Sequence, residues 1–472
     1  MNNEKNLYTS DTIVALATAT GVGAIAVIRL SGKEAIEIAD KIFKTTNGKL
    51  LSDVPSHTVH LGTLMSGKQV VDECLATIFK GNKSYTGEPV VEFSCHGSTY
   101  IIQEVIKLCL ANGARLAQAG EFTKRAFLNG KLALNQAEAV ADLIASDSAA
   151  SHQVALQQMR GGFTFEIETL RQELLNFASL IELELDFSEE DVAFADRKQL
   201  EQLLQKIKTT LTGLIQSFSA GNAIKNGIPV AIVGKPNAGK STLLNVLLNE
   251  ERAIVSDIAG TTRDTIEETL HIGGVTFRFI DTAGIRDTKD TIEAIGVEKA
   301  KEKMKKAQII LYLYNREENT TDEIKQFIKE NYREGVRIIL LCNKAENYIN
   351  SGVSSFEMEL LELPDKFIDR IINISARYKK NLSELEKALS QYAKNITTTS
   401  GNTIVTNIRH YEALQNALNA VEKVEEGMAN HLTGDLLAID IRETLYHLGS
   451  ITGAVSNDEV LGNIFSKFCI GK

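Results

Sequence analysis

The sequence predicts a multidomain chain of mixed α/β and all-α class. A doubly wound α/β domain is inserted into a discontinuous helical domain, and an α+β domain precedes both. Three observations predict this. The 472 residues exceed what one hydrophobic core serves, and 43% of them are hydrophobic. Short apolar runs alternate with helical segments only between Pro229 and Ser375. Long stretches of helical period flank that region on both sides, and the ends of an inserted domain usually lie close together.

The domain boundaries follow from these changes of pattern. Residues 1–121 mix strand-like runs such as TIVALAT and AIAVIRL with glycine turns and the helical stretch IIQEVIKLCLANG, which is typical of an α+β domain. The helical domain is expected at 122–224, interrupted by Gly161-Gly162, and again at 382–472. The doubly wound domain is expected at 225–381, with PVAIV, TFRFI, IILYLY and RIILLC as buried parallel strands.

Composition excludes some classes of protein. The net charge of -10 disfavours a surface devoted to the phosphate backbone of nucleic acid, although a local basic patch can still contact RNA. The five cysteines show no paired spacing, which argues against a disulfide framework or a zinc site. The sequence has no apolar leader and no apolar run of membrane-spanning length. A cytoplasmic protein without a membrane partner is therefore expected.

A phosphate-binding loop is predicted at residues 234–241, GKPNAGKS. The strand-like run PVAIV precedes it and STLLNVLLN opens a helix after it, which is the context such a loop requires. Backbone N–H groups would face the β-phosphate, Lys240 would contact the β- and γ-phosphates, and Ser241 would bind Mg²⁺. A glycine-rich turn without a ligand is the alternative, and the flanking strand and helix disfavour it.

Three further motifs indicate a guanine nucleotide. Asp281-Thr282-Ala283-Gly284 follows TFRFI, so Asp281 would face the Mg²⁺ from its second coordination shell and the Gly284 N–H would reach the γ-phosphate. Asn343-Lys344-Ala345-Glu346 and Ser375-Ala376-Arg377 resemble the NKxD and SAK motifs of GTPases. Glu346 stands where Asp is usual, and its carboxylate would accept hydrogen bonds from the guanine ring, so selectivity for guanine is expected to hold. Singly, the last two motifs would be ordinary surface loops, but together the motifs keep the order of a GTPase.

Gly260-Thr261-Thr262-Arg263-Asp264 resembles the switch-one sequence of a bacterial GTPase class that includes MnmE, Era-like and EngA-like proteins. The resemblance implies that Thr262 is a second Mg²⁺ ligand. It also implies a potassium ion, in place of an arginine finger, on oxygens of Asn237, Ser256, Ile258 and Thr261. Asn237 could instead be a simple turn former.

Ile285 occupies the position of the water-orienting Gln of other GTPases, so another group must orient the attacking water. In MnmE-type proteins this group is a Glu twelve residues after the DTAG Asp, here Glu293; a solvated surface Glu is the alternative. Catalysis is thus assigned to Glu293, Lys240, Thr262 and Gly284. The expected nucleotide-binding residues are Asn237, Ala238, Gly239, Lys240, Ser241, Thr242, Ser256, Asp257, Ile258, Ala259, Gly260, Thr261, Thr262, Asp281, Thr282, Ala283, Gly284, Asn343, Lys344, Glu346, Ser375, Ala376 and Arg377.

Nearly the whole chain resembles the MnmE (TrmE) family of tRNA-modification GTPases, in segments that include SYTGEPVVEFSCHG, GEFTKRAFLNGKLALNQAEAVADLI and the terminal FCIGK. The resemblance implies that the N-terminal domain binds a formyl-tetrahydrofolate and forms a homodimer. The matched folate positions are Arg29, Glu92, Lys131 and Lys472, which would otherwise be read as surface ion pairs. The loop ATATGVGA and the tripeptide Gln118-Ala119-Gly120 depart from the family pattern. Cys469 is linked to modification in the family, and a buried structural thiol is the alternative.

The function implied by the resemblance is GTP hydrolysis coupled to installing an aminomethyl-type group on C5 of the wobble uridine of certain tRNAs. An FAD-dependent MnmG-type partner, in a heterotetramer or larger complex, would supply the redox chemistry, since this chain has no flavin fingerprint. GTPase domains of the homodimer would meet through their switch loops. One alternative is a ribosome-assembly switch of the Era or EngA kind, for which no KH-type RNA-binding module is found in the sequence. The other is a folate-dependent enzyme with a regulatory GTPase domain.

Overall fold

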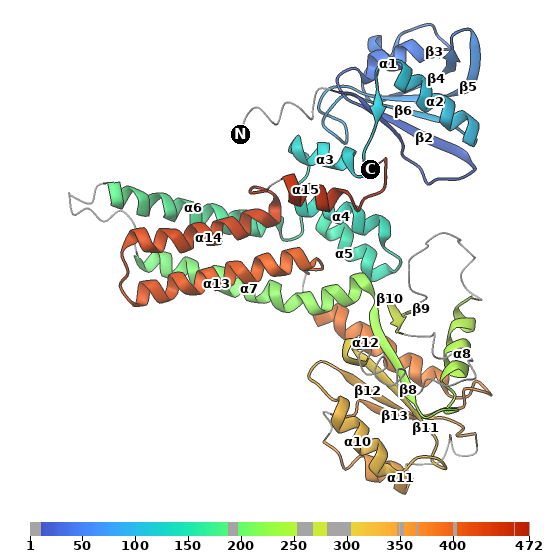
Figure 1. Cartoon of the computed structure of the whole chain (residues 1–472), viewed down its shortest axis with the longest axis vertical. Coiled ribbons are helices and arrows are strands. Elements are labelled where there is room, and N and C mark those ends of the chain that lie inside the picture. Colours follow the sequence, from blue (N-terminus) through green and yellow to red (C-terminus); the bar gives the residue numbers. More distant parts are fainter. Residues whose placement is uncertain are drawn as a thin grey trace. The chain divides into compact units, whose positions relative to one another are not determined.

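The computed structural model describes residues 11–186, 197–252, 268–280, 304–346, 349, 354–364, 367–399, 404–456 and 458–471. The chain forms two compact units. Unit 1 contains residues 1–141, 158–207 and 416–472, and unit 2 contains residues 142–157 and 208–415. Each unit is described by itself below, with the labels of Figure 1.

Unit 1 begins with a seven-stranded sheet in the order β3-β4-β5-β6-β2-β1-β7. Neighbouring strands are antiparallel except β1 and β7, which are parallel. The strands are β1 (Ile13–Leu16), β2 (Gly23–Ser31), β3 (Phe43–Thr45), β4 (Thr58–Ser66), β5 (Gln69–Phe79), β6 (Val90–Gly97) and β7 (Arg115–Leu116). The predicted strands TIVALAT and AIAVIRL are therefore confirmed as β1 and β2.

One face of this sheet packs on helices α1 (Ala35–Ile42) and α2 (Thr99–Ala111), which together enclose a hydrophobic core (Figure 1). A short 3-10 helix, η1 (Leu51–Asp53), contributes Leu51 to the same core. Successive side chains of a strand point to opposite faces of the sheet, so the residues between the core positions lie on the opposite face. On that open face Val59, Leu61 and Leu75 are 57%, 54% and 42% exposed. Leu61 and Leu75 are direct cross-strand partners.

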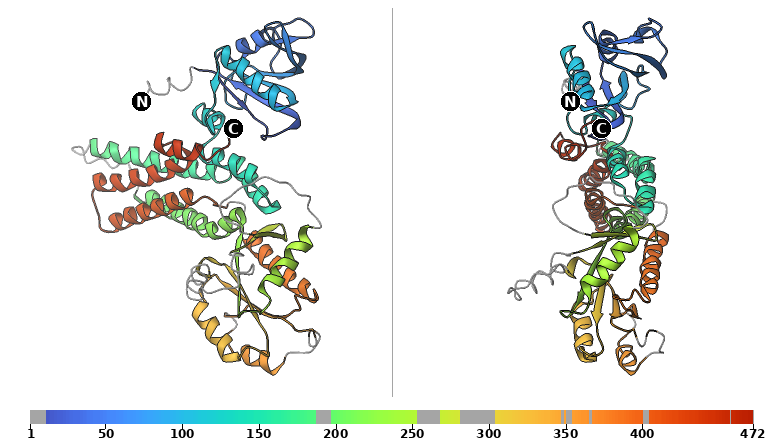
Figure 2. Two further views of the ribbon diagram at one scale, coloured as in Figure 1. Left: turned by 45° about the vertical axis from the view of Figure 1, so that its right-hand side comes forward. Right: turned by 90° about the vertical axis from the view of Figure 1, so that its right-hand side faces the viewer.

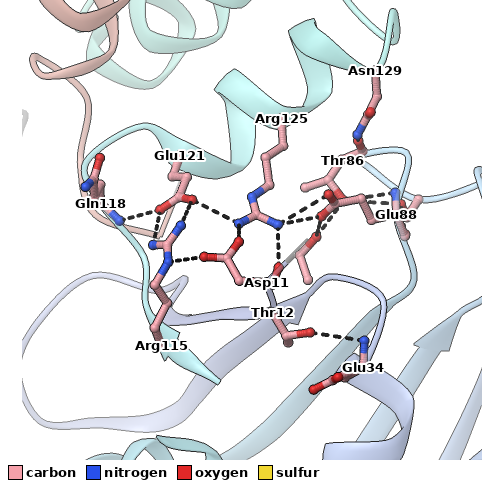
Figure 3. Close-up of polar contacts among 12 residues, drawn as sticks. Asp11, Thr12, Glu34, Thr86, Glu88, Arg115, Gln118, Glu121, Arg125 and Asn129 are labelled. Atoms are coloured by element: carbon pink, nitrogen blue, oxygen red, sulfur yellow. Dashed lines mark hydrogen bonds and ion pairs between the residues drawn. The ribbon is translucent and has the colours of Figure 1, made fainter. Parts of the chain in front are cut away.

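A buried ion-pair network joins helix α3 (Glu121–Leu128) to this sheet (Figure 3). Arg125, which is 2% exposed, donates to Asp11 Oδ1 at 2.7 Å, to Glu121 Oε1 at 3.0 Å and to Glu88 Oε2 at 3.1 Å. Arg115 also pairs with Asp11 and with Glu121. Burial raises the pKa of Glu121, but hydrogen bonds from Arg115 and Arg125 outweigh it, and the net pKa lies below the ordinary value. The network therefore fixes α3 only while these carboxylates are ionised.

The helical part of unit 1 follows the sequence pattern closely. Its elements include most of α4 (Leu134–Ala145), whose end from residue 142 belongs to unit 2, together with α6 (Thr164–Asp186), α14 (Gly434–Thr452) and α15 (Asp458–Phe465). Helices α6 and α14 lie side by side in both views (Figures 1 and 2), and Arg442 pairs with Glu182 at 2.6 Å. Helix α5 (Ala149–Met159), which belongs to unit 2 up to residue 157, ends before Gly161-Gly162, and α6 begins after them, as predicted.

Two long helices, α7 (Arg197–Asn226) and α13 (Ile408–Ala429), contact each other within each unit. In unit 1, Gln205 bonds to Glu425 at 2.7 Å. In unit 2, Phe218 stacks on Tyr411 with ring centroids 4.4 Å apart. In each unit, segments about two hundred residues apart in sequence are therefore in contact.

The C-terminal segment of unit 1 returns to the N-terminal sheet. Ile470 forms an isolated bridge with Ala119, and the Gly120 N–H donates to the Cys469 carbonyl at 3.4 Å. A Cβ on Gly471 would lie 2.0 Å from the Leu16 carbonyl oxygen, so only glycine fits there. Close backbone approach thus places the terminal residues beside β1.

Unit 2 contains a six-stranded sheet in the order β13-β12-β11-β8-β10-β9. The strands are β8 (Ile228–Gly234), β9 (Glu268–Ile272), β10 (Val275–Phe279), β11 (Ile309–Tyr314), β12 (Arg337–Cys342) and β13 (Arg370–Asn373). All are parallel except β9, which pairs antiparallel with β10 at the edge. The four predicted parallel strands are confirmed as β8, β10, β11 and β12, and β9 and β13 complete the sheet.

Helices cover both faces of this sheet: α8 (Lys240–Arg252) and α12 (Leu382–Thr399) on one, α10 (Thr321–Asn331) and α11 (Ser355–Leu360) on the other. Strand β11 shows why its sequence is apolar throughout. Leu311 and Leu313 enter the first core, whereas Ile310, Tyr312 and Tyr314 enter the second. Unit 2 is therefore a doubly wound α/β fold. None of the helices in the described parts of the chain is long and apolar enough to cross a membrane.

Candidate nucleotide-binding site

The phosphate loop, residues 234–241, connects β8 to α8 at the carboxyl edge of the sheet. Its glycines are required by close contacts. Gly239 has φ +99°, and a Cβ there would lie 2.2 Å from Asn343 Nδ2. A Cβ on Gly234, at φ +152°, would lie 2.3 Å from the Leu313 carbonyl oxygen. Asn237 has a left-handed φ of 61°, which Asn tolerates better than most residues. The loop is therefore wrapped closely on its neighbours.

Lys240 is folded back into this loop. Its ammonium donates to the carbonyl oxygens of Gly234 and Lys235, both at 2.9 Å. Burial lowers the pKa of Lys240, because the charged form loses hydration. An anion held by the loop would compensate that loss. Ser241 follows within the first turn of α8, where backbone N–H groups and the helix dipole favour a phosphate.

Asn343 joins three loops of the site. Its Nδ2 donates to the Ala238 carbonyl at 2.7 Å, and its Oδ1 accepts from the Ala376 N–H at 3.0 Å. Asn343 is only 4% exposed, so both bonds are shielded from water. The phosphate loop, the Asn343–Glu346 loop and the Ser375–Arg377 loop are consequently held in one arrangement by a single amide.

A cavity of about 690 Å³ opens between these loops. Its lining comprises Asn237, Gly239, Thr242, Asn343, Lys344, Glu346, Arg377, Tyr378 and Lys380. Ser375 donates its hydroxyl to Glu346 Oε1 at 2.9 Å, which orients the carboxylate. Since a carboxylate has two acceptor oxygens, Glu346 Oε2 can receive N–H donors from a bound ring. The cavity is thus lined by the phosphate loop at Asn237 and Gly239 and by the carboxylate acceptor of Glu346 from a second loop.

Some of the residues predicted to bind nucleotide line the cavity: Asn237, Gly239, Thr242, Asn343, Lys344, Glu346 and Arg377. Ala238, Ser375 and Ala376 are hydrogen-bonded to Asn343 or Glu346. Other predicted residues lie outside the described residues: Ser256, Asp257, Ile258, Ala259, Gly260, Thr261, Thr262, Asp281, Thr282, Ala283, Gly284 and Glu293. Sequence reasoning missed Tyr378 and Lys380. They reach the cavity because Ser375 and Lys380 form a backbone bridge that turns the chain, a contact with no local sequence signal.

A second group of predicted residues lies on the sheet of unit 1. Arg29 and Glu92 are cross-strand partners on β2 and β6, and Arg29 Nε donates to Glu92 Oε1 at 2.7 Å. The Arg29 guanidinium lies 5.7 Å from the Tyr85 ring centroid and 5.6 Å from that of Phe122. These residues form a small aromatic and charged cluster on the face that α1 and α2 leave open.

The other positions predicted with this group are placed separately. Lys131 donates to the Asn82 carbonyl at 2.8 Å, in the loop that also carries Tyr85. Lys472 lies outside the described residues. Cys469 is exposed, so its reading as a buried structural thiol is wrong, whereas the other four cysteines are buried. Within the described residues no cluster of His, Cys, Asp or Glu could hold a metal ion.

Two family models match most of the chain. The family model of the MnmE helical domain matches residues 134–469, and that of the GTP-binding protein TrmE N-terminus matches residues 12–131. The tRNA modification GTPase MnmE of Flavobacterium psychrophilum is 54% identical over 466 residues, covering 98% of this chain and 99% of the relative. The proteins of the same name from Christiangramia forsetii and Bacteroides thetaiotaomicron are 55% and 52% identical, each again over 98% of this chain and 99% of the relative. The chain therefore belongs to the MnmE family of tRNA modification GTPases.

Proposed function

We propose that this chain is the potassium-activated GTPase component of a system that modifies C5 of the tRNA wobble uridine, acting with an FAD-dependent MnmG-type partner. The observation that carries the proposal is the cavity in which Asn343 connects the phosphate loop to the Glu346 carboxylate. GTP has a triphosphate and a ring with adjacent N–H donors, and this loop and this carboxylate complement them.

The chain's own residues would divide the work as follows. Backbone N–H groups of the phosphate loop and Lys240 hold the triphosphate, and Glu346 accepts from the base, backed by Ser375. Arg377 and Lys344 line the same cavity. Glu293 orients the attacking water, and the Gly284 N–H meets the γ-phosphate. Hydrolysis then depends on positioning and charge neutralisation and needs no covalent intermediate.

Two cations are part of the proposal. Ser241, at the start of α8, and Thr262 would bind Mg²⁺ directly, and Asp281 would act from the second coordination shell of the ion. Asn237, which lines the cavity, would bind K⁺ with oxygens of Ser256, Ile258 and Thr261. A hard cation prefers such neutral and anionic oxygen donors. Ions held by these residues would supply positive charge to the triphosphate as its terminal bond breaks.

The N-terminal sheet supports the remaining assignments. The Arg29–Glu92 pair, beside the Tyr85 and Phe122 rings, offers aromatic and charged groups to a formyl-tetrahydrofolate, with Lys131 and Lys472 as further ligands. The same open face exposes Val59, Leu61 and Leu75, an apolar surface suited to a second copy of the chain. We therefore propose a homodimer with folate on this face and Cys469 as a residue required for modification.

The relatives that match the chain over nearly its full length are tRNA modification GTPases, which does not favour the ribosome-assembly alternative. The boundaries 1–121, 122–224, 225–381 and 382–472 remain our proposal for the functional domains.

GTP turnover in potassium against sodium buffer tests the cation mechanism. The native chain should be faster in potassium, Asn237→Ala should lose the difference, and Asn226→Ala, an exposed Asn at the end of α7, should keep it. Equal native rates in the two salts would refute potassium activation. Mass spectrometry of wobble uridines in tRNA from cells lacking this chain tests the modification role, and unchanged C5 modification would refute it.

A further inference from the structure

The segment after β11, residues 315–320, contacts both the phosphate loop and the Asn343–Glu346 loop. From the phosphate loop, the Lys235 ammonium donates to the Glu318 carbonyl at 2.8 Å and pairs with Glu323 Oε2 at 2.7 Å. From the Asn343–Glu346 loop, the Lys344 ammonium pairs with Glu318 Oε1 at 3.0 Å. Glu318 is thus in contact with one lysine through its backbone and with the other through its side chain.

The Glu318 carboxylate is held in place by its own segment. Asn315 Nδ2 donates to Glu318 Oε1 at 3.2 Å. Hydrogen bonds from Lys344 and Asn315 hold the pKa of Glu318 below its usual value, so the carboxylate stays charged at neutral pH. Lys344 lines the cavity and has a left-handed φ of 60°, which leaves its backbone dependent on surrounding contacts. Glu318 supplies one of those contacts.

Hydrogen bonds within the segment and the start of α10 hold Glu318 in place. The buried side chain of Asn319 accepts from the Asn315 N–H at 3.2 Å, and Asn315 Oδ1 accepts from the Glu317 N–H at 3.2 Å. Helix α10 begins directly afterwards with a capping box formed by Thr320 and Glu323. Glu318 is therefore anchored to the sheet and to α10, and it can hold Lys344 in a fixed position.

We infer that Glu318 is a positioning residue for nucleotide binding: it preorganises Lys344 at the rim of the cavity and ties the phosphate loop to the base-binding loop. This inference rests on the proposed nucleotide role of the cavity. Preorganisation lowers the entropy that binding must overcome, so it acts on affinity and on the rate of dissociation. Because Glu318 does not reach the cavity lining, it leaves the chemical step unchanged.

The test compares Glu318→Gln with Glu317→Gln, which removes the same charge from the neighbouring exposed position. A fluorescent GDP analogue should dissociate about two- to fivefold faster from Glu318→Gln, the range for an exposed ion pair, and at the native rate from Glu317→Gln. Steady-state GTP hydrolysis should show a raised KM and an unchanged kcat for Glu318→Gln. Tetramethylammonium chloride, added at constant KCl, should shrink the difference because it screens the pair.

Equal dissociation rates for the two variants, or slower dissociation from Glu318→Gln, would overturn the inference. A kcat that falls as far as kcat/KM would also overturn it, since the carboxylate would then act in the transition state. Failure of the native chain to bind the analogue would instead refute the nucleotide role of the cavity, so the two failures are distinguishable.

Discussion

Replacing Gly239 by Ala tests how tightly the three nucleotide loops are joined. The new Cβ would lie 2.2 Å from Asn343 Nδ2, so the amide must retreat by about 1 Å to reach ordinary contact. That movement breaks the bonds from Asn343 to Ala238 and Ala376, now 2.7 and 3.0 Å long. Each buried group left unpaired costs about 1–3 kcal/mol. A side chain at φ +99° adds about 1 kcal/mol, so the total loss is about 3 kcal/mol or more.

The assay is thermal unfolding followed by circular dichroism, with and without GDP. For a unit of this size, a loss of about 3 kcal/mol lowers the midpoint of the unit 2 transition by about 6–12 °C. GDP should no longer raise that midpoint, because ligand stabilisation requires the native site. The matched control is Gly213→Ala, inside α7, where an added Cβ meets nothing within 4 Å. This control should stabilise unit 2 by about 0.5–1 kcal/mol, the usual gain from Gly to Ala within a helix.

One result would refute the reasoning. The structure leaves no room for both the new Cβ and the Asn343 side-chain amide. If Gly239→Ala unfolds within about 2 °C of the native midpoint and GDP still raises that midpoint, then Asn343 does not hold the loops together.

Other predictions follow from the same contacts. Glu346→Gln replaces one acceptor oxygen by an amide, and the preference for GDP over ADP should fall about tenfold or more in competition titrations; an unchanged ratio would exclude Glu346 from base recognition. Arg125→Ala leaves buried carboxylates unpaired and should cost about 3–5 kcal/mol in urea unfolding of unit 1, and a loss below 1 kcal/mol would contradict the network. The folded-state pKa of Glu121 is lowered, so its contribution to stability is complete above about pH 4.5 and is lost as the pH falls below that value; Glu121→Gln should flatten this acid limb. Gly471→Ala would place a Cβ 2.0 Å from a β1 carbonyl oxygen, so carboxypeptidase should remove the C-terminal residues faster; native digestion kinetics would show that the segment is not seated there.

Local sequence signals were sufficient to predict those features that depend on a single strand or loop. The apolar runs of β8, β10, β11 and β12 predicted a doubly wound sheet, because a strand covered on both faces must be apolar at every position. The phosphate loop was predictable for a related reason, since its glycines are needed for backbone contacts at fixed spacing. The edge strand β9 was not predicted, because its run ETLHI alternates polar and apolar residues over only five positions.

Long-range contacts account for what the sequence did not reveal. The bridge from Asn343 to Ala238, the bond from Ser375 to Glu346 and the pairing of Lys235 and Lys344 around Glu318 all join residues far apart in the chain. Such bonds depend on which strand ends become neighbours, a consequence of strand order that no local period encodes.

By itself, the sequence determined the fold class and the phosphate loop, because hydrophobic period and glycine spacing are local properties of the chain; the guanine-type motifs came from their resemblance to motifs of GTPases. Only the tertiary structure decided which side chains share the cavity, that the Arg29–Glu92 pair lies on an open sheet face, and that Glu318 stands between two lysines. The physical reason is that a hydrogen bond or ion pair requires atoms within about 3 Å of each other, and packing of the whole sheet sets those distances.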